Sequence, residues 1–460
     1  MSRRRWIVAA LAVAALLGGA AAGLSRFMPI VTPMTAAEID ASARNTGLGD
    51  CFWVGVGTTG GLNYAYPDTG ANYWISQFRL PPGAALDFTG EFPHARHLSF
   101  NAYNEGGKPV DRLNDVLIRP DAGAVNPFLV GSARDADRRG YGFHIVAADV
   151  EAGASMAQRD AARAVNTLYV PKGDTPVQLM MRIYVPDKGL TPKAGAMLPA
   201  PTLKMADGSR VHGQALCQRI VVKEGAARVP HLELAATRTL LSLEDRQSPY
   251  HPAQGQPRWE SFFNPPYVLT RALVGTKFEW VRSLLSTKRS GGFYSTLDNT
   301  YMLLYVDDRY GDALVLRGKA PTTPRTVDGE RRTDAGQLRY WSLCKYRSLN
   351  DTRVDGCLYD EQIPLDRDGN YTIVVSTAAH RPANASRACG VAWLAWGAGD
   401  GIANAHGGFL LYRHMLPAEG FEQSLFATRQ PGDEPRTLGP YYPDTRYSSK
   451  AAFERSGCAR

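Results

Sequence analysis

The two halves of the chain carry the same pattern of residues. Five residues of the first half recur 228 positions later with the same residue types: Tyr73, Gly83, Leu86, Gly90 and Pro93 match Tyr301, Gly311, Leu314, Gly318 and Pro321. Five identities at one offset are hard to attribute to chance. A repeating unit of about 120 residues is several times longer than a solenoid repeat, so it indicates two copies of a whole domain.

The correspondence continues after an inserted basic loop around Thr322–Gly336, where the offset becomes 243. Arg96–Tyr103 then aligns with Arg339–Tyr346, and both segments read Arg, ring, apolar, Ser, apolar, two variable residues and Tyr. Two further matches complete the repeat: Asp115 with Asp360, and Met181–Pro186 with Tyr412–Pro417. The last match makes Arg182 the counterpart of Arg413.

Short runs rich in Val, Ile, Tyr, Phe and Trp alternate in polarity within each copy and stop at Gly, Pro, Asn or Asp. This pattern is typical of β-strands separated by turns. Leu98, Phe100 and Ala102 are expected to point to one side of their strand and the intervening polar residues to the other. We predict an all-β protein with a minor helical part, made of two homologous antiparallel β-sandwich or jelly-roll-like modules in tandem.

The predicted modules cover residues 49–190 and 300–430, with a connector at 191–299 between them and a polar tail at 431–460. In the connector we expect a strand at Cys217–Val222. We also expect a short amphipathic helix, in which four apolar residues recur at helical spacing after the N-cap candidate Thr276: Phe278, Val281, Leu284 and Leu285.

Residues 1–22 have the layout of a bacterial signal peptide. Three arginines at positions 3–5 precede the uncharged stretch Trp6–Leu24, and Ala20–Ala22 offers a small-residue cleavage site. The alternative is a retained membrane anchor, because 19 apolar residues are just enough to span a bilayer. Both interpretations place the body of the protein outside the cytoplasm, in the periplasm, in the extracellular space or on the outer face of the membrane.

Six cysteines follow this segment, and an even number in an exported chain favours disulfides. Fifteen connectivities are open to six cysteines. The best local prediction is a bond between Cys344 and Cys357, which flank a loop. If that loop joins two antiparallel strands, the two residues face each other at bonding distance.

The formal net charge is +8, or +5 without residues 1–22, which is mild for a chain of this length. No run of Lys and Arg with interleaved aromatic residues predicts a nucleic-acid site. A solvated basic surface is the simpler interpretation. Contact with a membrane is expected only through the N-terminal segment, if it is not cleaved.

The sequence contains no GxSxG elbow, Walker loop, GxGxxG after a strand, HExxH or EF-hand loop. His94 and His97 are three residues apart on a predicted strand, so their side chains should point to opposite faces. Asp366–Asn370 lacks the Glu that would close a calcium loop, and its Asp-Gly pair favours a turn. We therefore predict no metal site and no cofactor.

The polar strip formed by His97, Ser99, Asn101 and Tyr103 is the best candidate surface for a ligand, because Tyr and His combine a flat apolar body with polar tips. The simpler interpretation is that this face of the sheet is polar because it meets water. Ser99, His97 and Asp115 also have the residue types of a catalytic triad, although Ser and His two positions apart on a strand need a special geometry.

Arginines and aspartates recur in both copies, as Arg96 with Arg339, Arg182 with Arg413, and Asp115 with Asp360. Arginine and a carboxylate can form a bidentate ion pair with a fixed geometry. We interpret the recurrence as one structural Arg–Asp bridge in each module. Binding of a substrate by these arginines is the alternative.

Trp341–Tyr346 and Met181–Pro186 resemble motifs of a bacterial all-β family known as the domain of unknown function 1214 family. These motifs are an early Trp-Ser-apolar-x-x-Tyr strand and a late strand ending in Arg-Leu-Tyr-x-Pro. Trp393–Gly397 is similar to the turn before the late strand, and the resemblance covers about 240 residues as two copies. Leu98 replaces the Trp in the first copy, and Arg413 is followed by His-Met. The resemblance implies a β fold and no particular reaction.

We predict an exported envelope or extracellular protein with a binding or structural role toward a carbohydrate, a lipid or another amphiphilic ligand. The alternative is a secreted enzyme, a hydrolase or lyase, with a non-standard site in the cleft between the modules. Seven residues are the ligand-binding candidates: His97, Ser99, Asn101, Tyr103, Asp115, Arg182 and Arg413.

Overall fold

The computed structural model describes residues 30–58, 60–148, 156–233, 235–236, 256–268, 286–348, 351–400 and 405–458. Two sequence predictions lie outside these residues, namely the signal peptide at 1–22 and the amphipathic helix that follows Thr276. Within the described ranges, no helix has both the length and the hydropathy that a membrane span requires.

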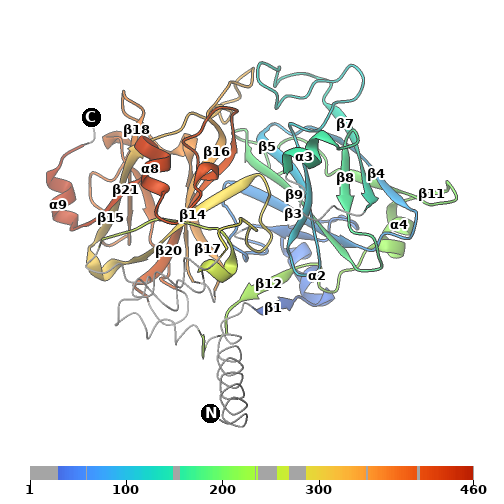
Figure 1. Ribbon diagram of the computed structural model, residues 1–460, viewed down its shortest axis with the longest axis horizontal. Coiled ribbons are helices and arrows are strands. Elements are labelled where there is room, and N and C mark those ends of the chain that lie inside the picture. The colour runs from blue at the N-terminus through green and yellow to red at the C-terminus, as the bar shows by residue number, and fades with distance from the viewer. Residues whose placement is uncertain are drawn as a thin grey trace, which may run out of the picture.

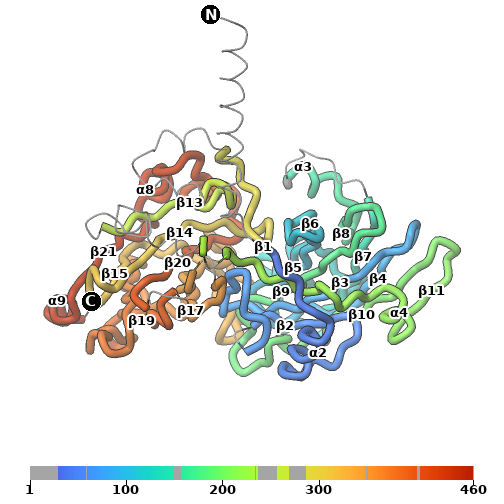
Figure 2. Tube along the Cα trace, turned by 90° about the horizontal axis from the view of Figure 1, so that it is seen from below, coloured from blue at the N-terminus to red at the C-terminus, as the bar shows by residue number. Residues whose placement is uncertain are grey.

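The chain forms two β-rich modules that lie side by side (Figures 1 and 2). Module 1 contains strands β2 to β11 and is drawn in blue to green, and module 2 contains strands β13 to β21 and is drawn in yellow to red. Each module consists of two packed sheets with a few short helices. The predicted all-β class with two tandem modules is confirmed.

In each module, the sheet that lies against the other module is called the facing sheet, and the second one is called the outer sheet. The facing sheet of module 1 has the order β2 (Gly55–Gly57), β3 (Ala71–Phe78), β9 (Val177–Pro186), β5 (Ala95–Tyr103) and β6 (Pro109–Asn114). Its outer sheet has the order β11 (Arg210–His212), β10 (Ala200–Lys204), β4 (Ala85–Glu91), β7 (Gly140–Ala147) and β8 (Thr167–Val170).

Module 2 repeats this arrangement. Its facing sheet has the order β13 (Glu260–Ser261), β14 (Asn299–Asp307), β20 (Gly407–Pro417), β16 (Leu338–Tyr346) and β17 (Val354–Tyr359). Its outer sheet has the order β19 (Ala392–Ala395), β18 (Asn370–Ser376), β15 (Ala313–Lys319) and β21 (Asp444–Ser448). The pairing is antiparallel except at matching places, where β8 runs parallel to β7 and β19 runs parallel to β18.

The strand registers show that the two modules are copies of one fold. In module 1, Arg182 lies between Tyr73 and Ser99 on its two neighbouring strands. In module 2, Arg413 lies in the same way between Tyr301 and Ser342. The irregularity between Ala102 and Tyr103 also recurs between Lys345 and Tyr346. Arg96 and Arg339 therefore occupy equivalent positions, as the repeat predicts.

Strand alternation separates the core from the face that meets the other module. Leu98, Phe100 and Ala102 are buried in the core between the two sheets of module 1, and Trp341 and Leu343 are buried in the equivalent core of module 2. A period of two along a strand directs alternate side chains to opposite faces, so the polar residues of β5 point to module 2.

The first part of the predicted connector belongs to module 1. Strand β10 pairs with β4 and extends the outer sheet, and the helix α4 (Gly213–Ile220) follows it. The strand expected at Cys217–Val222 is therefore wrong. Leu216, Cys217 and Ile220 are buried at helical spacing against the core of module 1, and this packing decides the local structure.

Besides α4, the helices whose bounds fall within the described residues lie at the periphery of the modules: α2 (Ala36–Asn45), α3 (Met156–Ala161), α8 (Glu434–Leu438) and α9 (Lys450–Arg455). A two-stranded ribbon of β1 (Ile30–Pro33) and β12 (Arg228–His231) lies beside module 1. The predicted polar tail is part of module 2, because β21 pairs with β15 along its whole length and the ring of Phe453 in α9 is buried.

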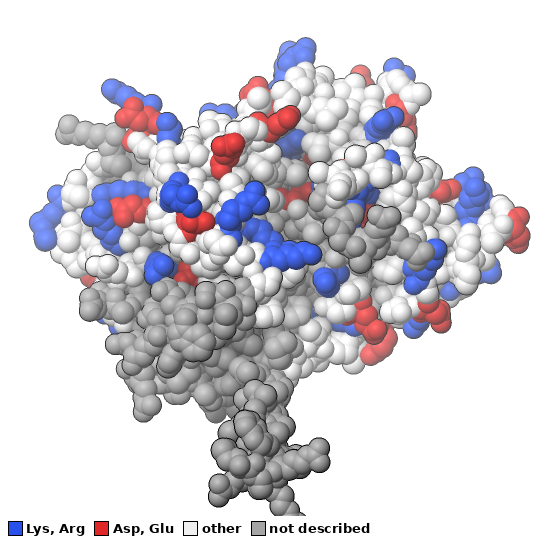
Figure 3. Space-filling view, in the orientation of Figure 1, with Lys and Arg blue, Asp and Glu red and all other residues white. Residues whose placement is uncertain are grey.

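Three disulfides join the six cysteines: Cys51–Cys217, Cys344–Cys357 and Cys389–Cys458. The predicted pair is confirmed, since Cys344 lies directly opposite Cys357 on β16 and β17. Cysteine pairs at bonding distance are compatible with an oxidising compartment. On the face shown in Figure 3, acidic and basic side chains lie interspersed among uncharged ones.

His414 makes the stability of module 2 sensitive to acid. Its ring is buried on β20, and Nδ1 accepts a hydrogen bond from the backbone N–H of Leu425 at 3.2 Å. Burial lowers the pKa of His414 to about 3. The unfolded chain takes up a proton near pH 6.5, where the folded chain does not, so stability falls as the pH falls below 6.5.

We expect this one residue to account for about 2 kcal/mol of the stability lost between pH 7 and pH 5. The substitution His414→Asn keeps an acceptor for Leu425 and removes the titrating group. Urea unfolding midpoints at the two pH values check this. The variant should lose less stability on acidification than the wild type does, and an equal loss would refute the assignment.

Candidate functional site

The two modules meet around a local two-fold axis between β5 and β16. Arg96 Nη1 donates to the backbone oxygen of Arg339 at 3.4 Å, and Arg339 Nη1 donates to the backbone oxygen of Arg96, also at 3.4 Å. A contact in which residue i meets residue j, and j meets i in return, is the signature of a two-fold interface. The duplicated chain thus packs its two halves like the subunits of a dimer.

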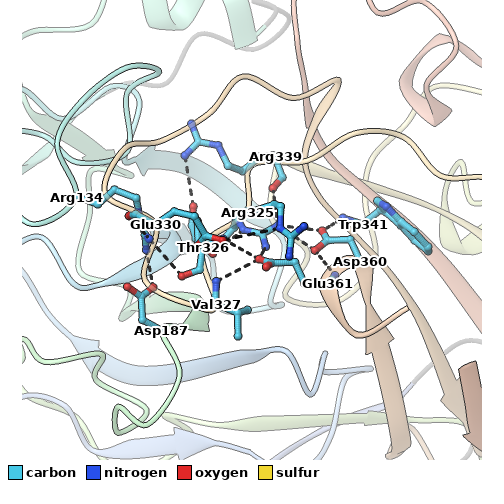
Figure 4. Close-up of polar contacts among 11 residues, drawn as sticks. Arg134, Asp187, Arg325, Thr326, Val327, Glu330, Arg339, Trp341, Asp360 and Glu361 are labelled. Carbon is cyan, nitrogen blue, oxygen red and sulfur yellow. Dashed lines mark hydrogen bonds and ion pairs between the residues drawn. The ribbon is translucent and has the colours of Figure 1, made fainter. Parts of the chain in front are cut away.

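The predicted Arg–Asp bridges form between the modules and not within them. Arg96 Nη1 donates to both carboxylate oxygens of Asp360 at 3.0 Å, and Arg96 also pairs with Glu361. Arg339 lies 3.8 Å from Asp115. Each arginine lies near the start of its strand, and its guanidinium is close to a carboxylate of the other module. Figure 4 shows Asp360 and Glu361 beside Arg339.

The inserted loop of module 2 fastens this contact. Thr326 accepts a hydrogen bond from Arg96 Nε at 2.9 Å, and its backbone N–H donates to Glu361 at 2.8 Å. Arg134 of module 1 donates to the backbone oxygen of Thr326 and pairs with Asp187 (Figure 4). The insertion that interrupts the sequence repeat is therefore a clasp between the modules.

Each module also sends one carboxylate into the facing sheet of the other. Asp68 precedes β3 of module 1, and it accepts hydrogen bonds from Tyr340 at 3.0 Å and from Ser342 at 2.7 Å in module 2. It also forms an ion pair with Arg413. Asp68 and Arg413 are both buried, and the carboxylate of Asp68 balances the positive charge of the guanidinium.

Asp298 is the carboxylate that crosses in the opposite direction. It precedes β14 of module 2, and it lies 2.6 Å from Arg112 Nε and accepts from the side-chain amide of Asn114 at 2.8 Å. His97 Nε2 is 4.0 Å from the same carboxylate. Arg112 has a second partner in Asp160, so Asp298 belongs to a larger network of charges.

The predicted polar strip is buried between the modules. His97, Ser99, Asn101 and Tyr103 have no exposed surface, so water does not explain the polarity of this face. His97 Nδ1 lies 2.8 Å from Asp115, and Asp115 also accepts a hydrogen bond from the backbone N–H of Leu98 at 2.8 Å.

These contacts do not form a triad. The Ser99 hydroxyl accepts from the amide of Asn101 at 3.1 Å, and the second ring nitrogen of His97, Nε2, faces Asp298. Burial works to raise the pKa of Asp115, but His97 and Arg339 hold that pKa below its usual value. A nucleophile needs its hydroxyl within reach of the base, and here the hydroxyl and the base point to different partners.

A cavity of about 150 Å³ lies between the facing sheets, next to this interface. Strands β3 and β9 of module 1 and β14 and β20 of module 2 line it, together with the segments at 64–67, 230–232 and 292–296. Of the seven candidate residues, Arg182 and Arg413 line the cavity. The structure places His97, Ser99, Asn101, Tyr103 and Asp115 in the neighbouring interface.

The cavity wall is mostly apolar and rich in rings, among them Tyr73, Tyr184, Phe262, Tyr301, Tyr305 and Phe409. Some buried polar atoms in this wall have no hydrogen-bond partner within the described part of the chain: Tyr64 Oη, Arg182 Nη1, Ser295 Oγ and Asn299 Oδ1. Buried polar atoms are normally paired, so these atoms mark a place where a ligand or water completes the structure.

The two equivalent arginines differ in their charge balance. Arg413 has Asp68, and the pKa of Arg413 lies well above its usual range because Asp68 outweighs the effect of burial. Arg182 donates through Nη2 to the backbone oxygen of Tyr294, and its guanidinium lies over the rings of Tyr73 and Tyr103. No carboxylate of the described chain pairs with Arg182.

Neutral groups therefore surround the buried charge of Arg182. Burial opposes the charge, but nearby tyrosines hold the pKa of Arg182 above its usual value, with Tyr103 as the largest contributor. The guanidinium cannot lose its proton in a protein, so the positive charge stays in the cavity wall.

The sequence alone did not identify Asp68, the aromatic wall of the cavity, or the difference in charge partners between Arg182 and Arg413. Asp68 lies outside the aligned segments, so no motif marked it. The signal that could have found it is the offset of 228, which aligns Asp68 with Thr296. That comparison shows that module 2 lacks a carboxylate where module 1 has one.

No protein-family model matches the chain, and no curated protein matches it. The resemblance to the domain of unknown function 1214 family therefore stays a prediction. Among solved structures, an uncharacterised protein from Burkholderia cenocepacia is similar at 12% identity, covering 91% of this chain and 88% of that chain with a TM-score of 0.46.

A protein from Vibrio parahaemolyticus is similar at 11% identity, covering 90% of this chain and 97% of that chain with a TM-score of 0.37. Neither likeness is close enough to transfer a property to this chain.

Proposed function

We propose that this chain is an exported binding protein that holds a small amphiphilic ligand in the cavity between its two modules. The observation that carries the proposal is the cavity wall itself. It is mostly apolar and aromatic, it draws on both modules, and it holds a few polar atoms that have no hydrogen-bond partner among the described residues. Ligand sites combine such an apolar lining with a small number of polar groups that fix orientation.

The wall favours a lipid-like or aromatic ligand over a carbohydrate. A sugar needs a partner for each of its hydroxyl groups, whereas this wall offers mostly ring faces and aliphatic side chains. An apolar cavity of about 150 Å³ accepts a molecule of the size of benzene. The buried part of the ligand is therefore expected to be one ring or a medium-length alkyl chain.

Two further observations support export. The six cysteines are paired in three disulfides, which persist in oxidising compartments. The N-terminal residues carry the charge and apolar pattern of a secretory signal. The alternative of a secreted enzyme has no comparable support, since His97, Ser99 and Asp115 lie outside the cavity wall.

Filling the cavity tests the proposal. Leu303 lies on β14 and lines the cavity, so Leu303→Trp is expected to occupy the space that a ligand needs. Octan-1-ol and octanoate serve as probes, and binding at 100 times the dissociation constant adds about 2.7 kcal/mol of stability. A thermal-shift titration of the wild type should show a rise in the unfolding temperature, and the variant should show none.

Met197→Trp is the matched control, because Met197 is 78% exposed and lies outside the cavity. It should respond to the probes as the wild type does. If Leu303→Trp does not fold, the milder Leu411→Phe on β20 replaces it, since Leu411 lines the same cavity. A wild-type protein that neither probe stabilises would rule the proposal out.

A further inference from the structure

Arg182 and Arg413 would have the same surroundings if the two modules were perfect copies. Each lies between a tyrosine and a serine on the neighbouring strands of its facing sheet. Each also has a second tyrosine close to its guanidinium, Tyr103 for Arg182 and Tyr346 for Arg413. A difference in their charge partners therefore comes from residues outside the sheet.

The turns before β3 and β14 determine which of the two arginines has a carboxylate partner. In the first turn, the side chain of Asp68 accepts from the N–H of Gly70, and its backbone oxygen accepts from Ala71. In the second turn, Thr296 accepts in the same two ways from Asp298 and Asn299. Thr296 thus stands where module 1 has Asp68.

This substitution leaves Arg182 without the carboxylate that its counterpart has. The Asp68 carboxylate crosses to Arg413, whereas the Thr296 hydroxyl carries no charge to offer to Arg182. Arg182 is 2% exposed, and its Nη1 has no hydrogen-bond partner in the described chain. Burying a charge without a partner is costly, so a group from outside the chain is expected to supply the missing anion.

We propose that the ligand of this cavity is an anionic amphiphile whose carboxylate pairs with Arg182. This inference rests on the proposed function and adds the charge and place of the head group. Thr296 and Arg182 both line the cavity, so a carboxylate there would take the place that Asp68 takes in the other half. One monoanion balances one guanidinium, whereas a dianionic phosphate would bury an excess negative charge.

The hydroxyl of Ser295 lies in the same wall and has no partner in the described chain. It would supply a donor for the second carboxylate oxygen. The apolar part of the ligand would then lie against the rings of both modules. The cavity therefore has a polar end at Arg182 and an apolar remainder.

Four probes with one alkyl chain test this, namely octanoate, octan-1-ol, octylammonium and octyl phosphate. Titration calorimetry on the wild-type chain should give octanoate an affinity about 10- to 100-fold higher than octan-1-ol, the range expected for a hydrogen bond to a charged group. Octylammonium should bind more weakly than octan-1-ol. Tighter binding of octyl phosphate than of octanoate would contradict the monoanionic head group.

Arg182→Met should lower the octanoate affinity by about 10- to 100-fold and leave that of octan-1-ol within about threefold. Arg182→Lys keeps the charge and should recover part of the loss. Arg446→Met removes one exposed charge on β21, where the side chain is 77% exposed, and should change neither affinity.

The two proposals fail in different ways. If octan-1-ol and octanoate bind the wild type equally well, the anionic head group is wrong and the cavity remains a ligand site. If none of the probes binds, the proposed function itself is wrong.

Discussion

Replacing Arg96 with methionine is expected to lower the free energy of unfolding by about 3–5 kcal/mol, the loss typical of a buried ion pair broken on one side. Arg96 has no exposed surface on its side chain, and it contacts the carboxylates of both Asp360 and Glu361. Without the guanidinium, Asp360 and Glu361 stay at the centre of the interface and lose this ion-pair partner. The midpoints of urea unfolding of the wild type and the variant measure this loss, provided that the dependence of the unfolding free energy on urea concentration is the same for both.

The pH dependence of this loss is part of the prediction. Burial raises the pKa of Asp360 above its usual value, although Arg96 opposes the shift. Once Arg96 is gone, only the backbone N–H groups of Trp341 and Glu361 still oppose the effect of burial, so the carboxyl group takes up a proton more readily. The loss should therefore be larger at pH 8 than at pH 5. An equal loss at both pH values would show that lost packing, and not charge, is responsible.

Arg339→Met is the matched control, because Arg339 occupies the equivalent position in module 2. Its side chain is 10% exposed, and its nearest acidic partner, Asp115, is 3.8 Å away. Asp115 keeps His97 and the N–H of Leu98 when Arg339 is removed. The control should lose clearly less stability than Arg96→Met. Equal losses would mean that the clasp around Thr326 does not strengthen the Arg96 side of the interface.

Replacing Asp68 with alanine is expected to cost a similar amount, about 3–5 kcal/mol, for the opposite reason. The substitution removes the anion and leaves the guanidinium of Arg413 buried and unpaired. It also removes the acceptor of the hydroxyl groups of Tyr340 and Ser342. The unfolding temperature should fall strongly, and circular dichroism at 20 °C should still report a β-rich fold.

The double variant Asp68→Ala with Arg413→Met should be more stable than Asp68→Ala alone. Apolar side chains often replace a buried ion pair with little loss of stability, whereas a buried charge without its partner lowers the stability strongly. Asp298→Ala serves as a comparison, because its partner Arg112 keeps Asp160. It should cost less than Asp68→Ala. No recovery in the double variant would contradict the charge balance assigned to Arg413.

The sequence was sufficient to predict the strands and their two faces. Alternation along Arg96–Tyr103 correctly assigns Leu98 and Phe100 to the core, because a period of two depends only on local backbone geometry. The cross-strand pair Cys344–Cys357 follows from the same geometry. The connector was less predictable, since packing of Leu216 and Ile220 decides that this segment is a helix.

The interface could not be predicted from either copy alone. Arg96 and Asp115 belong to the same module and look like partners in the sequence, yet Arg96 pairs with Asp360 of the other module. The polar strip at His97 looked solvent-exposed for the same reason, because one copy does not reveal that its polar face packs against another. The way in which two homologous modules pack depends on contacts between residues far apart in the sequence. A sequence repeat indicates only that the two modules have the same fold.

A crystal structure of the full chain grown with octanoate is the most direct test of the account. We expect the carboxylate within hydrogen-bonding distance of Arg182 Nη1, close to Thr296, with the alkyl chain against the rings of both modules. Octanoate bound only at another place, or an empty cavity under conditions in which octanoate binds in solution, would contradict the account.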